Sequence, residues 1–336
     1  MSGDNVAYNL RPNKFVERQL FVELLSYLCS EGSPEQYIYV SMGGPQLEDS
    51  RLVHQRLGFK NLISIEENPI IHARQQFNLR PSYIMCQIKS VADFVDDFDE
   101  FQTEYYDKDK IIWFDYASPR ERRQQLVEYE TVLSQLEEGD ILKITMNAHP
   151  GTLGERRRGE STEYIQKVRR DALLEQLDGY INREIDHLQV TKRNLPITLA
   201  QAIKYTSIRA LQTSPKYMAL PLCLFVYQDG PHQMLTVTVR VTKVREARSI
   251  RQSLTERGWE FLPPDNNWQT ITRINVPNLS AKERLYLEHI LFADAHETIH
   301  EKLPFRFHLN ESVSLNILQE YARHYRRYPS FFQVIL

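Results

Sequence analysis

Residues 37–69, YIYVSMGGPQLEDSRLVHQRLGFKNLISIEENP, constrain the fold of this chain more than any other stretch. The pattern predicts a short buried strand, a turn at Gly43 and Gly44, a helix, and a second strand that ends at the acidic pair Glu66 and Glu67. In such a unit, bare glycine backbone can approach the tail of a nucleoside-type cofactor, and a carboxylate can bind its ribose hydroxyls. The stretch therefore predicts a nucleoside-cofactor fold.

The same alternation continues along the chain. Further strands are expected at 83–88, in IIWFDYASP after residue 110, and at ILKITMN before residue 148, with helices at 69–78 and 120–136 between them. The acidic stretch after residue 90 is interpreted as a solvated helix face and loop. Strands that alternate with helices of this length predict a parallel, doubly wound α/β sheet.

Three regions follow from the change of pattern after the fifth strand. We predict a Rossmann-like core at 1–147 and 218–243, where the last two strands form an antiparallel hairpin around Asp229-Gly230-Pro231. Residues 148–217 are polar and helical in period, which predicts a charged insertion acting as a lid or in substrate recognition. Residues 244–336 predict a mainly helical region, with a capping box at Ser280 and Glu283.

Composition sets broad limits. The chain has 336 residues and a net charge of −3, which gives no global bias toward nucleic acid or membrane. Cys29, Cys86 and Cys223 are isolated, as expected for core residues in a reducing compartment. Neither a signal-peptide pattern nor a window of about eighteen apolar residues is visible, so we expect a cytoplasmic protein.

The order of these units resembles that of class I S-adenosylmethionine-dependent methyltransferases. VSMGG is similar to their glycine-rich first motif, ISIEENP to the acidic end of their second strand, WFDYASP to the motif after the fourth strand, and LEEGDILKIT to the approach to the fifth. These patterns all fall at the carboxyl ends of predicted strands, where open α/β sheets bind ligands. The matches cover roughly residues 36–147 and, more weakly, 218–243.

The resemblance implies S-adenosylmethionine as the cofactor, with Glu66 accepting hydrogen bonds from the ribose hydroxyls. The cofactor-binding candidates are Ser41, Met42, Gly43, Gly44, Glu66, Glu67, Ser90 and Asp115. The chain also departs from the family pattern. Ser41 stands at about the position of the usual first-motif acid, Pro45 follows the two glycines, and Ser90 stands near the usual adenine-binding carboxylate.

Four residues are candidates for the acceptor side. Asp115 could orient or deprotonate a nucleophile, and Tyr116 could stack on a planar substrate. The alternative is that the two form a helix N-cap and its aromatic packing partner. Asn147 and His149, after the fifth strand, are the other pair. In metal-dependent relatives an Asp-Asn pair here binds magnesium, but Met146 replaces that Asp, so we predict no metal site.

Basic residues suggest possible partners. A run after residue 153 could bind nucleic acid, although acidic residues among the cations favour a charged surface helix or mobile lid. Its cations are Arg156, Arg157, Arg158, Lys167, Arg169 and Arg170. Arg11 and Lys14 could reach a phosphate or carboxylate over the sheet edge, but we favour a surface turn.

The C-terminal segment mixes aromatic and basic residues, which could bind nucleic acid or a protein partner. Packing of its aromatics into the domain or a partner is favoured, because the last residues are apolar. The residues concerned are Tyr321, His324, Tyr325, Arg326, Arg327, Tyr328, Phe331 and Phe332.

Two functional hypotheses remain. The resemblance implies S-adenosylmethionine-dependent methyl transfer to an unidentified oxygen or nitrogen acceptor. The alternative is a non-catalytic subunit of the same fold that binds a protein or nucleic-acid partner. An enzyme needs Glu66 and Asp115 to face one open pocket, whereas a scaffold can fill that space with its own side chains. An enzyme for another nucleotide is disfavoured by the incomplete GxGxxG pattern.

Overall fold

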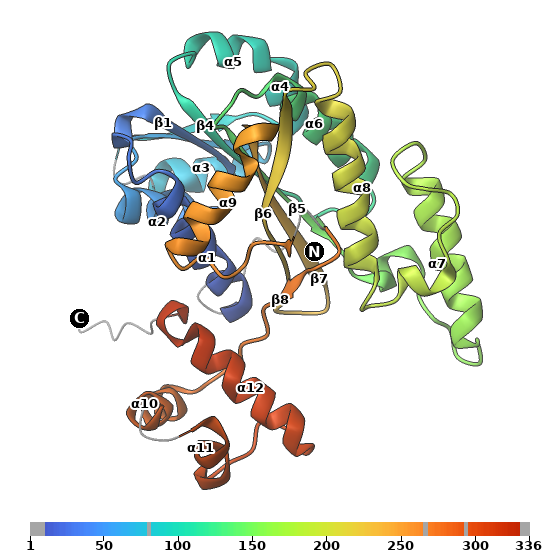
Figure 1. Cartoon of the computed structure of the whole chain (residues 1–336). Helices are drawn as coiled ribbons and strands as arrows, with labels where there is room; N and C mark the ends of the chain where they lie inside the picture. Colours follow the sequence, from blue (N-terminus) through green and yellow to red (C-terminus); the bar gives the residue numbers. More distant parts are fainter. Residues whose placement is uncertain (1–10, 79–81, 265–267, 292–294, 330–336) are drawn as a thin grey trace.

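An eight-stranded sheet organises the chain (Figure 1), in the order β3-β2-β1-β4-β5-β7-β6-β8. The computed structural model describes residues 11–78, 82–264, 268–291 and 295–329. Strands β1 to β5 are parallel, and β7 runs antiparallel to both β5 and β6. The strands are β1 Tyr37–Met42, β2 Asn61–Glu66, β3 Ile84–Ile88, β4 Asp109–Asp115, β5 Ile141–Asn147, β6 Tyr217–Gln228, β7 Gln233–Lys243 and β8 Thr272–Arg273. The predicted doubly wound α/β fold with a terminal hairpin is confirmed.

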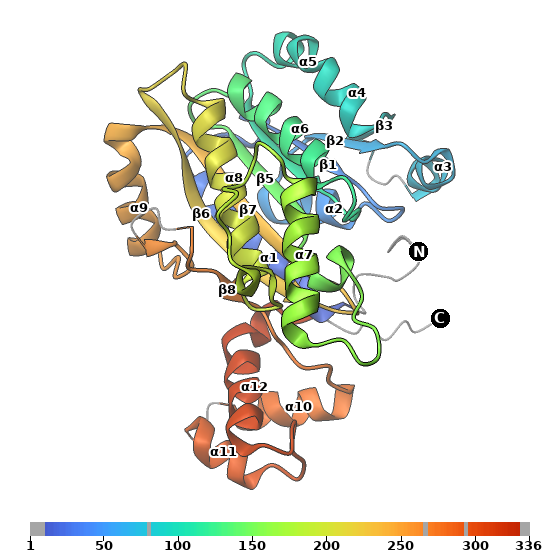
Figure 2. The same ribbon diagram turned by 90° about the vertical axis from the view of Figure 1, so that its right-hand side faces the viewer.

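Helices cover both faces of this sheet (Figure 2). Helices α4, α5, α6 and α8 pack in the hydrophobic cluster on one face, and α1, α2 and α9 pack on the other. Their bounds are α1 Pro12–Leu28, α2 Glu48–Leu57, α4 Val91–Asp96, α5 Phe98–Glu104, α6 Arg122–Gln135, α8 Leu195–Ala210 and α9 Ala247–Glu256. Strands β1, β2 and β4 bury alternate residues in the clusters on the two faces, as the period of a strand requires.

The local signals at helix ends are found where the sequence places them. Pro12 occupies the first turn of α1, and Gly58 ends α2 in the left-handed conformation at φ 74°. Helix α3 (Pro69–Asn78) follows β2 with its proline in the first turn. The predicted capping box at Ser280 and Glu283 begins α10 (Ala281–Ile290). These short-range patterns need no tertiary context, which explains why sequence identifies them.

Residues 148–217 contain two different kinds of helix. Helix α7 (Thr162–Gln176) is largely exposed and stands away from the sheet in Figure 1. Helix α8 instead buries Leu199 and Ile203 in the main core beneath β6 and β7. It completes the helical layer over the hairpin, so this segment supplies part of the sheet's covering as well as an exposed arm.

The C-terminal helices pack against α1 and β6 and extend to one side of the sheet (Figures 1 and 2). They are α10 Ala281–Ile290, α11 His296–Lys302 and α12 Glu311–His324. Tyr321, His324 and Tyr328 are buried there, as the packing hypothesis expects. Phe331 and Phe332 lie outside the described residues. No helix in the described ranges has the length and apolar character needed to cross a membrane.

Candidate functional site

The turn after β1 is held tightly against β2. A Cβ atom on Gly43 would collide with the Ser64 side chain, and the Gly43 carbonyl accepts a hydrogen bond from Gln75 of α3. Neither Gly43 nor Gly44 has a positive φ; in this turn Leu47 is the left-handed residue, at φ 53°. Gly43 is therefore required by close approach to a neighbouring strand rather than by an unusual backbone conformation.

Strand alternation brings several predicted residues to one face. Ser41, Glu66 and Asp115 lie in phase with residues that pack beneath α1 and α2, such as Tyr39, Leu62 and Trp113. Met42 is out of phase and packs in the cluster on the opposite face, although its sulfur accepts a hydrogen bond from the Asp115 amide at 3.2 Å. The carboxyl ends of three neighbouring strands thus present polar side chains toward α1.

Glu66 ends β2 and is half-buried. One of its carboxylate oxygens accepts a hydrogen bond from the amide of Asn68 at 2.8 Å. Glu67 is exposed, so the two neighbouring acids have different surroundings. Ser90 forms the capping box of α4 with Asp93: its oxygen accepts from the Asp93 amide at 3.1 Å. In this arrangement the Ser90 hydroxyl is engaged in holding a helix end.

Asp115 at the end of β4 is paired with Lys14 of α1. The Lys14 ammonium lies 2.8 Å from the carboxylate, and both side chains are about nine-tenths buried. Burial by itself raises the pKa of Asp115, but Lys14, Arg18 and Lys143 outweigh it, so this pKa lies below its ordinary value. The residue at the N-cap position of α6 is Glu121, so the predicted alternative of Asp115 as a helix cap is wrong.

The first turn of α1 is fixed by the hairpin that joins β6 and β7. The Asp229 carboxylate accepts hydrogen bonds from the amides of Asn13 and Lys14, at 2.9 and 2.7 Å. The Asn13 side chain in turn accepts from the amide of Val276 at 2.7 Å. The interpretation of Lys14 as part of a surface turn is therefore wrong, because three distant segments meet at this helix start and bury it.

A second ion pair lies deeper under the same helix. Glu17 and Lys143 are 2.7 Å apart and essentially without solvent exposure. The Lys143 ammonium also lies 3.5 Å from the ring centroid of Trp113 and 4.0 Å from that of Phe21. Sequence analysis did not identify this pair. The only signal for it is a lysine at the third position of a seven-residue strand that is otherwise mostly apolar, ILKITMN.

Tyr116 points to the opposite side of the sheet. It packs with Phe114 in the main core, and its hydroxyl donates a hydrogen bond to Glu128 of α6. Tyr116 is only 7% exposed, which corrects the expectation that its ring stacks on a substrate. Its packing fixes the backbone directly after Asp115, so its role here is to position the loop.

Asn147 and His149 are brought together after β5. The Asn147 side chain accepts a hydrogen bond from the His149 amide at 3.0 Å. Its carbonyl accepts two bonds from Arg122, at 3.1 and 2.9 Å, and Arg122 also donates to Pro119 and Thr152. Burial lowers the pKa of Arg122 to about 10. This buried arginine, which sequence analysis missed, holds the loops after β4 and β5 to each other.

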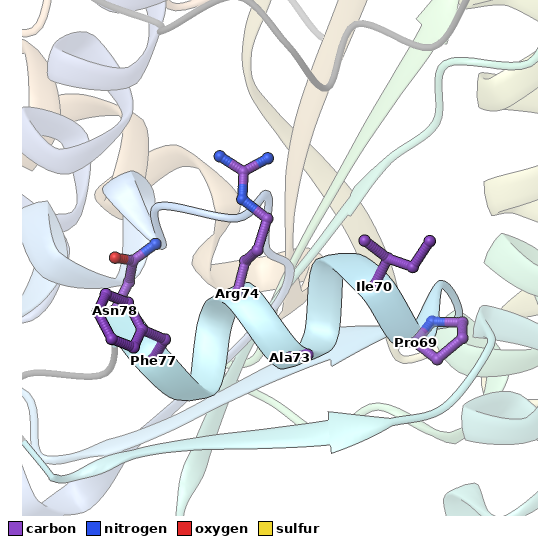
Figure 3. A pocket seen from close by; sticks show the side chains of 6 residues that line it. All are labelled: Pro69, Ile70, Ala73, Arg74, Phe77 and Asn78. Carbon is purple, nitrogen blue, oxygen red and sulfur yellow. The ribbon is translucent and has the colours of Figure 1, made fainter.

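One shallow hollow lies along the outer side of α3 (Figure 3), with Ile70 73% and Phe77 87% exposed. It is lined by Pro69, Ile70, Ala73, Arg74, Phe77 and Asn78. None of the predicted site residues lines it. Among the described residues, no group of three or more His, Cys, Asp or Glu side chains is arranged to bind a metal.

The basic stretch around α7 is mostly paired within itself. Arg156 donates to the Glu160 carbonyl, Lys167 pairs with Glu163 at 2.6 Å, and Arg170 pairs with Asp171 at 2.7 Å. These local pairs match the expectation of a charged surface helix.

Comparison with solved structures gives many distant matches. The N-methyltransferase NodS from Bradyrhizobium japonicum is 13% identical with a TM-score of 0.33, over 68% of this chain and 97% of NodS. Trm1 from Pyrococcus horikoshii, solved with S-adenosyl-L-methionine, is 14% identical with a TM-score of 0.41, over 94% of this chain and 77% of Trm1. TrmK from M. capricolum, solved with S-adenosylhomocysteine, is 10% identical with a TM-score of 0.32, over 86% and 92%.

A search of curated proteins gives no match. A family model does match, over residues 6–336, and its description is "Putative O-methyltransferase". This span includes the whole sheet and both helical regions, so the match does not depend on one motif. The chain therefore belongs to this O-methyltransferase family.

Proposed function

We propose that this protein transfers the methyl group of S-adenosylmethionine to an oxygen of an acceptor molecule. The observation that carries the proposal is the family match over nearly the whole chain. The geometry supports it, because Glu66 ends β2 and Asp115 ends β4, the two parallel strands on either side of β1. The two residues lie in phase on the same face of the sheet.

Four of the candidate residues have a proposed role on the cofactor side. The Gly43-Gly44 turn brings bare backbone close to the carboxyl edge, and Glu66 accepts hydrogen bonds from the ribose hydroxyls. Asp115 supplies a buried negative charge for a cationic part of the cofactor, in exchange for Lys14. The donor set fits, because a carboxylate that already binds an ammonium ion can bind another cation at the same oxygens.

When bound, the sulfonium supplies an activated methyl group, so the protein mainly needs to orient the acceptor and exclude water. The core at 1–147 and 218–243 would hold the cofactor, and the exposed α7 part of 148–217 would cover the acceptor side. Residues 244–336 would hold α1 in place. Three free cysteines in the described chain support a location in a reducing compartment such as the cytoplasm.

Calorimetric titration with S-adenosylmethionine and S-adenosylhomocysteine tests the proposal. We expect saturable binding of both, weakened roughly tenfold or more by Glu66→Ala, because a charge-assisted pair is lost. Glu35→Ala is the control: it removes an exposed acid before β1, at the opposite edge of the sheet, and should leave the affinity unchanged. Absence of binding to the wild-type protein would contradict the proposal.

A non-catalytic role is the second candidate, and one observation favours it. Lys14 already neutralises Asp115 in a buried pair, so the chain fills part of this space with its own side chain. Under this hypothesis the calorimetric titration shows no cofactor binding, and Lys14→Gln does not restore it. Cofactor binding by the wild-type protein would contradict the second candidate.

A further inference from the structure

Two histidines from distant segments meet at the carboxyl end of β5. His149 lies two residues after that strand, and His232 directly precedes β7. The antiparallel pairing of Asn147 with Met234 brings the two together. Their ring centroids are 5.4 Å apart, and the ring planes are inclined by 81°. His149 is half-buried, whereas His232 is exposed.

The surroundings of this pair are cationic. Burial lowers the pKa of His149, and His232, Lys192 and Arg169 lower it further. No carboxylate is among the groups that act on this imidazole within the described residues. Lys192 is exposed and forms no ion pair in the described part of the chain, and the buried Nδ1 of His149 has no hydrogen-bond partner there.

Gln233 fixes the backbone next to His149 and at Lys192. This fully buried side chain donates to the carbonyls of Ala148 and Lys192, at 3.2 and 2.9 Å. Its oxygen accepts from Arg273 at 2.9 Å. Arg169 is tied to the carbonyl of Gly154 at 2.9 Å. Positive charges gathered in this way repel one another, and an anion among them offsets the free-energy cost of that repulsion.

We propose that His149, His232, Lys192 and Arg169 form a subsite for an anionic oxygen-acid group, a carboxylate or a phosphate, of the methyl acceptor. The inference rests on the proposed function, because the cluster lies at the same carboxyl edge of the sheet as Asp115. Imidazole, ammonium and guanidinium groups all donate hydrogen bonds to such an anion. The subsite selects acceptors with an acidic group and orients them toward the end of β4.

Histidine-detected NMR of the full chain tests this subsite, with inorganic phosphate and benzoate as separate probes. We expect one of them to shift the His149 and His232 ring signals saturably and to raise the apparent pKa of His149. Lys192→Gln and His232→Gln should each weaken that binding about fivefold or more. Lys60→Gln is the control, because Lys60 lies at the opposite, amino-terminal edge beside Glu35 and should leave anion binding unchanged.

The two probes separate the sources of the anion: a response to phosphate alone indicates a phosphate ester, and a response to benzoate alone a carboxylic acid. If neither moves the His149 signals, or both variants bind like wild type, the subsite is wrong. S-adenosylhomocysteine is titrated into the same samples. If S-adenosylhomocysteine binds and neither anion does, only the subsite is overturned. If an anion binds and S-adenosylhomocysteine does not, the acceptor role and the proposed function are overturned, although the anion site itself stands.

Discussion

The ammonium of Lys14 lies 2.8 Å from the carboxylate of Asp115, and this contact joins the first helix to the end of the fourth strand. The two side chains are about nine-tenths buried, so the pair has little solvent to screen it. The start of α1 is fixed there by Asp229 of the β6–β7 turn. A residue expected at the surface therefore lies at the centre of the candidate site.

Loss of Lys14 should destabilise the protein. In Lys14→Met the carboxylate of Asp115 loses its closest counter-charge, and breaking a buried pair in this way costs about 3 kcal/mol or more of unfolding free energy. Denaturant unfolding at pH 7 measures this change. The double variant with Asp115→Asn should lose less than the sum of the two single changes. Lys60→Met, which breaks an exposed pair with Glu35, should cost far less, because solvent screens that pair; an equal loss in both variants would contradict the prediction.

The environment of His324 predicts a loss of stability in mild acid. Burial, together with Arg327 and Arg323, lowers the pKa of this histidine to about 4, below its ordinary value of 6.5. Because the folded-state pKa is the lower one, its contribution to stability is complete above pH 6.5 and is lost as the pH falls toward 4. Thermal unfolding between these values should show the loss, on the order of 2 kcal/mol. In His324→Gln this part of the pH dependence should disappear; a wild-type slope there would refute the assignment.

Gly43 should not tolerate a methyl group. In Gly43→Ala the new Cβ meets the Ser64 side chain, and relief of that collision requires Ser64 to rotate or the turn to move, at a cost of about 1–3 kcal/mol. We expect lower stability in denaturant unfolding and weaker cofactor binding in calorimetry. Ser64→Gly in the same chain removes the colliding atoms and should restore part of both. If the double variant is no better than Gly43→Ala, steric contact with Ser64 is not the reason for glycine.

Arg122 should hold the loops after β4 and β5 together. In Arg122→Leu the carbonyls of Asn147 and Pro119 and the hydroxyl of Thr152 lose their donor, which costs about 3 kcal/mol or more. Hydrogen exchange should then accelerate in residues 147–153, next to His149. The exposed neighbour Arg123 provides the control, because Arg123→Leu keeps all these bonds. Unchanged exchange in Arg122→Leu would contradict this role.

Much of the sheet was predictable because its signals are local. Strands β1, β2, β4 and β5 are short, mostly apolar runs that end near a Gly, Pro or acidic turn, and the helices between them have recognisable ends, as at Gly58 and Pro69. Strand β8 was missed, because two residues carry no periodic pattern. Helix α8 was assigned to an insertion, because its sequence resembles other amphipathic helices and does not specify what it packs against.

The predictions for Asp115 and Tyr116 show what sequence patterns do not determine for single residues. Strand alternation puts these neighbours on opposite faces, one beneath α1 and the other beneath α6. Sequence placed both at the end of a strand but did not specify which face holds the ligand. The proposed roles of Glu66 and Asp115 therefore remain predictions that rest on family resemblance and on position in the sheet.

By itself, the sequence determined the alternation of strands and helices, the helix ends and the carboxyl edge at which polar residues gather, because these depend on periods of two and about 3.6 residues. Only the tertiary structure decided that Lys14 pairs with Asp115, Glu17 with Lys143, and His149 with His232. Such contacts join segments that are distant along the chain. They follow from how helices cover a twisted sheet, and no local pattern of residues records that geometry.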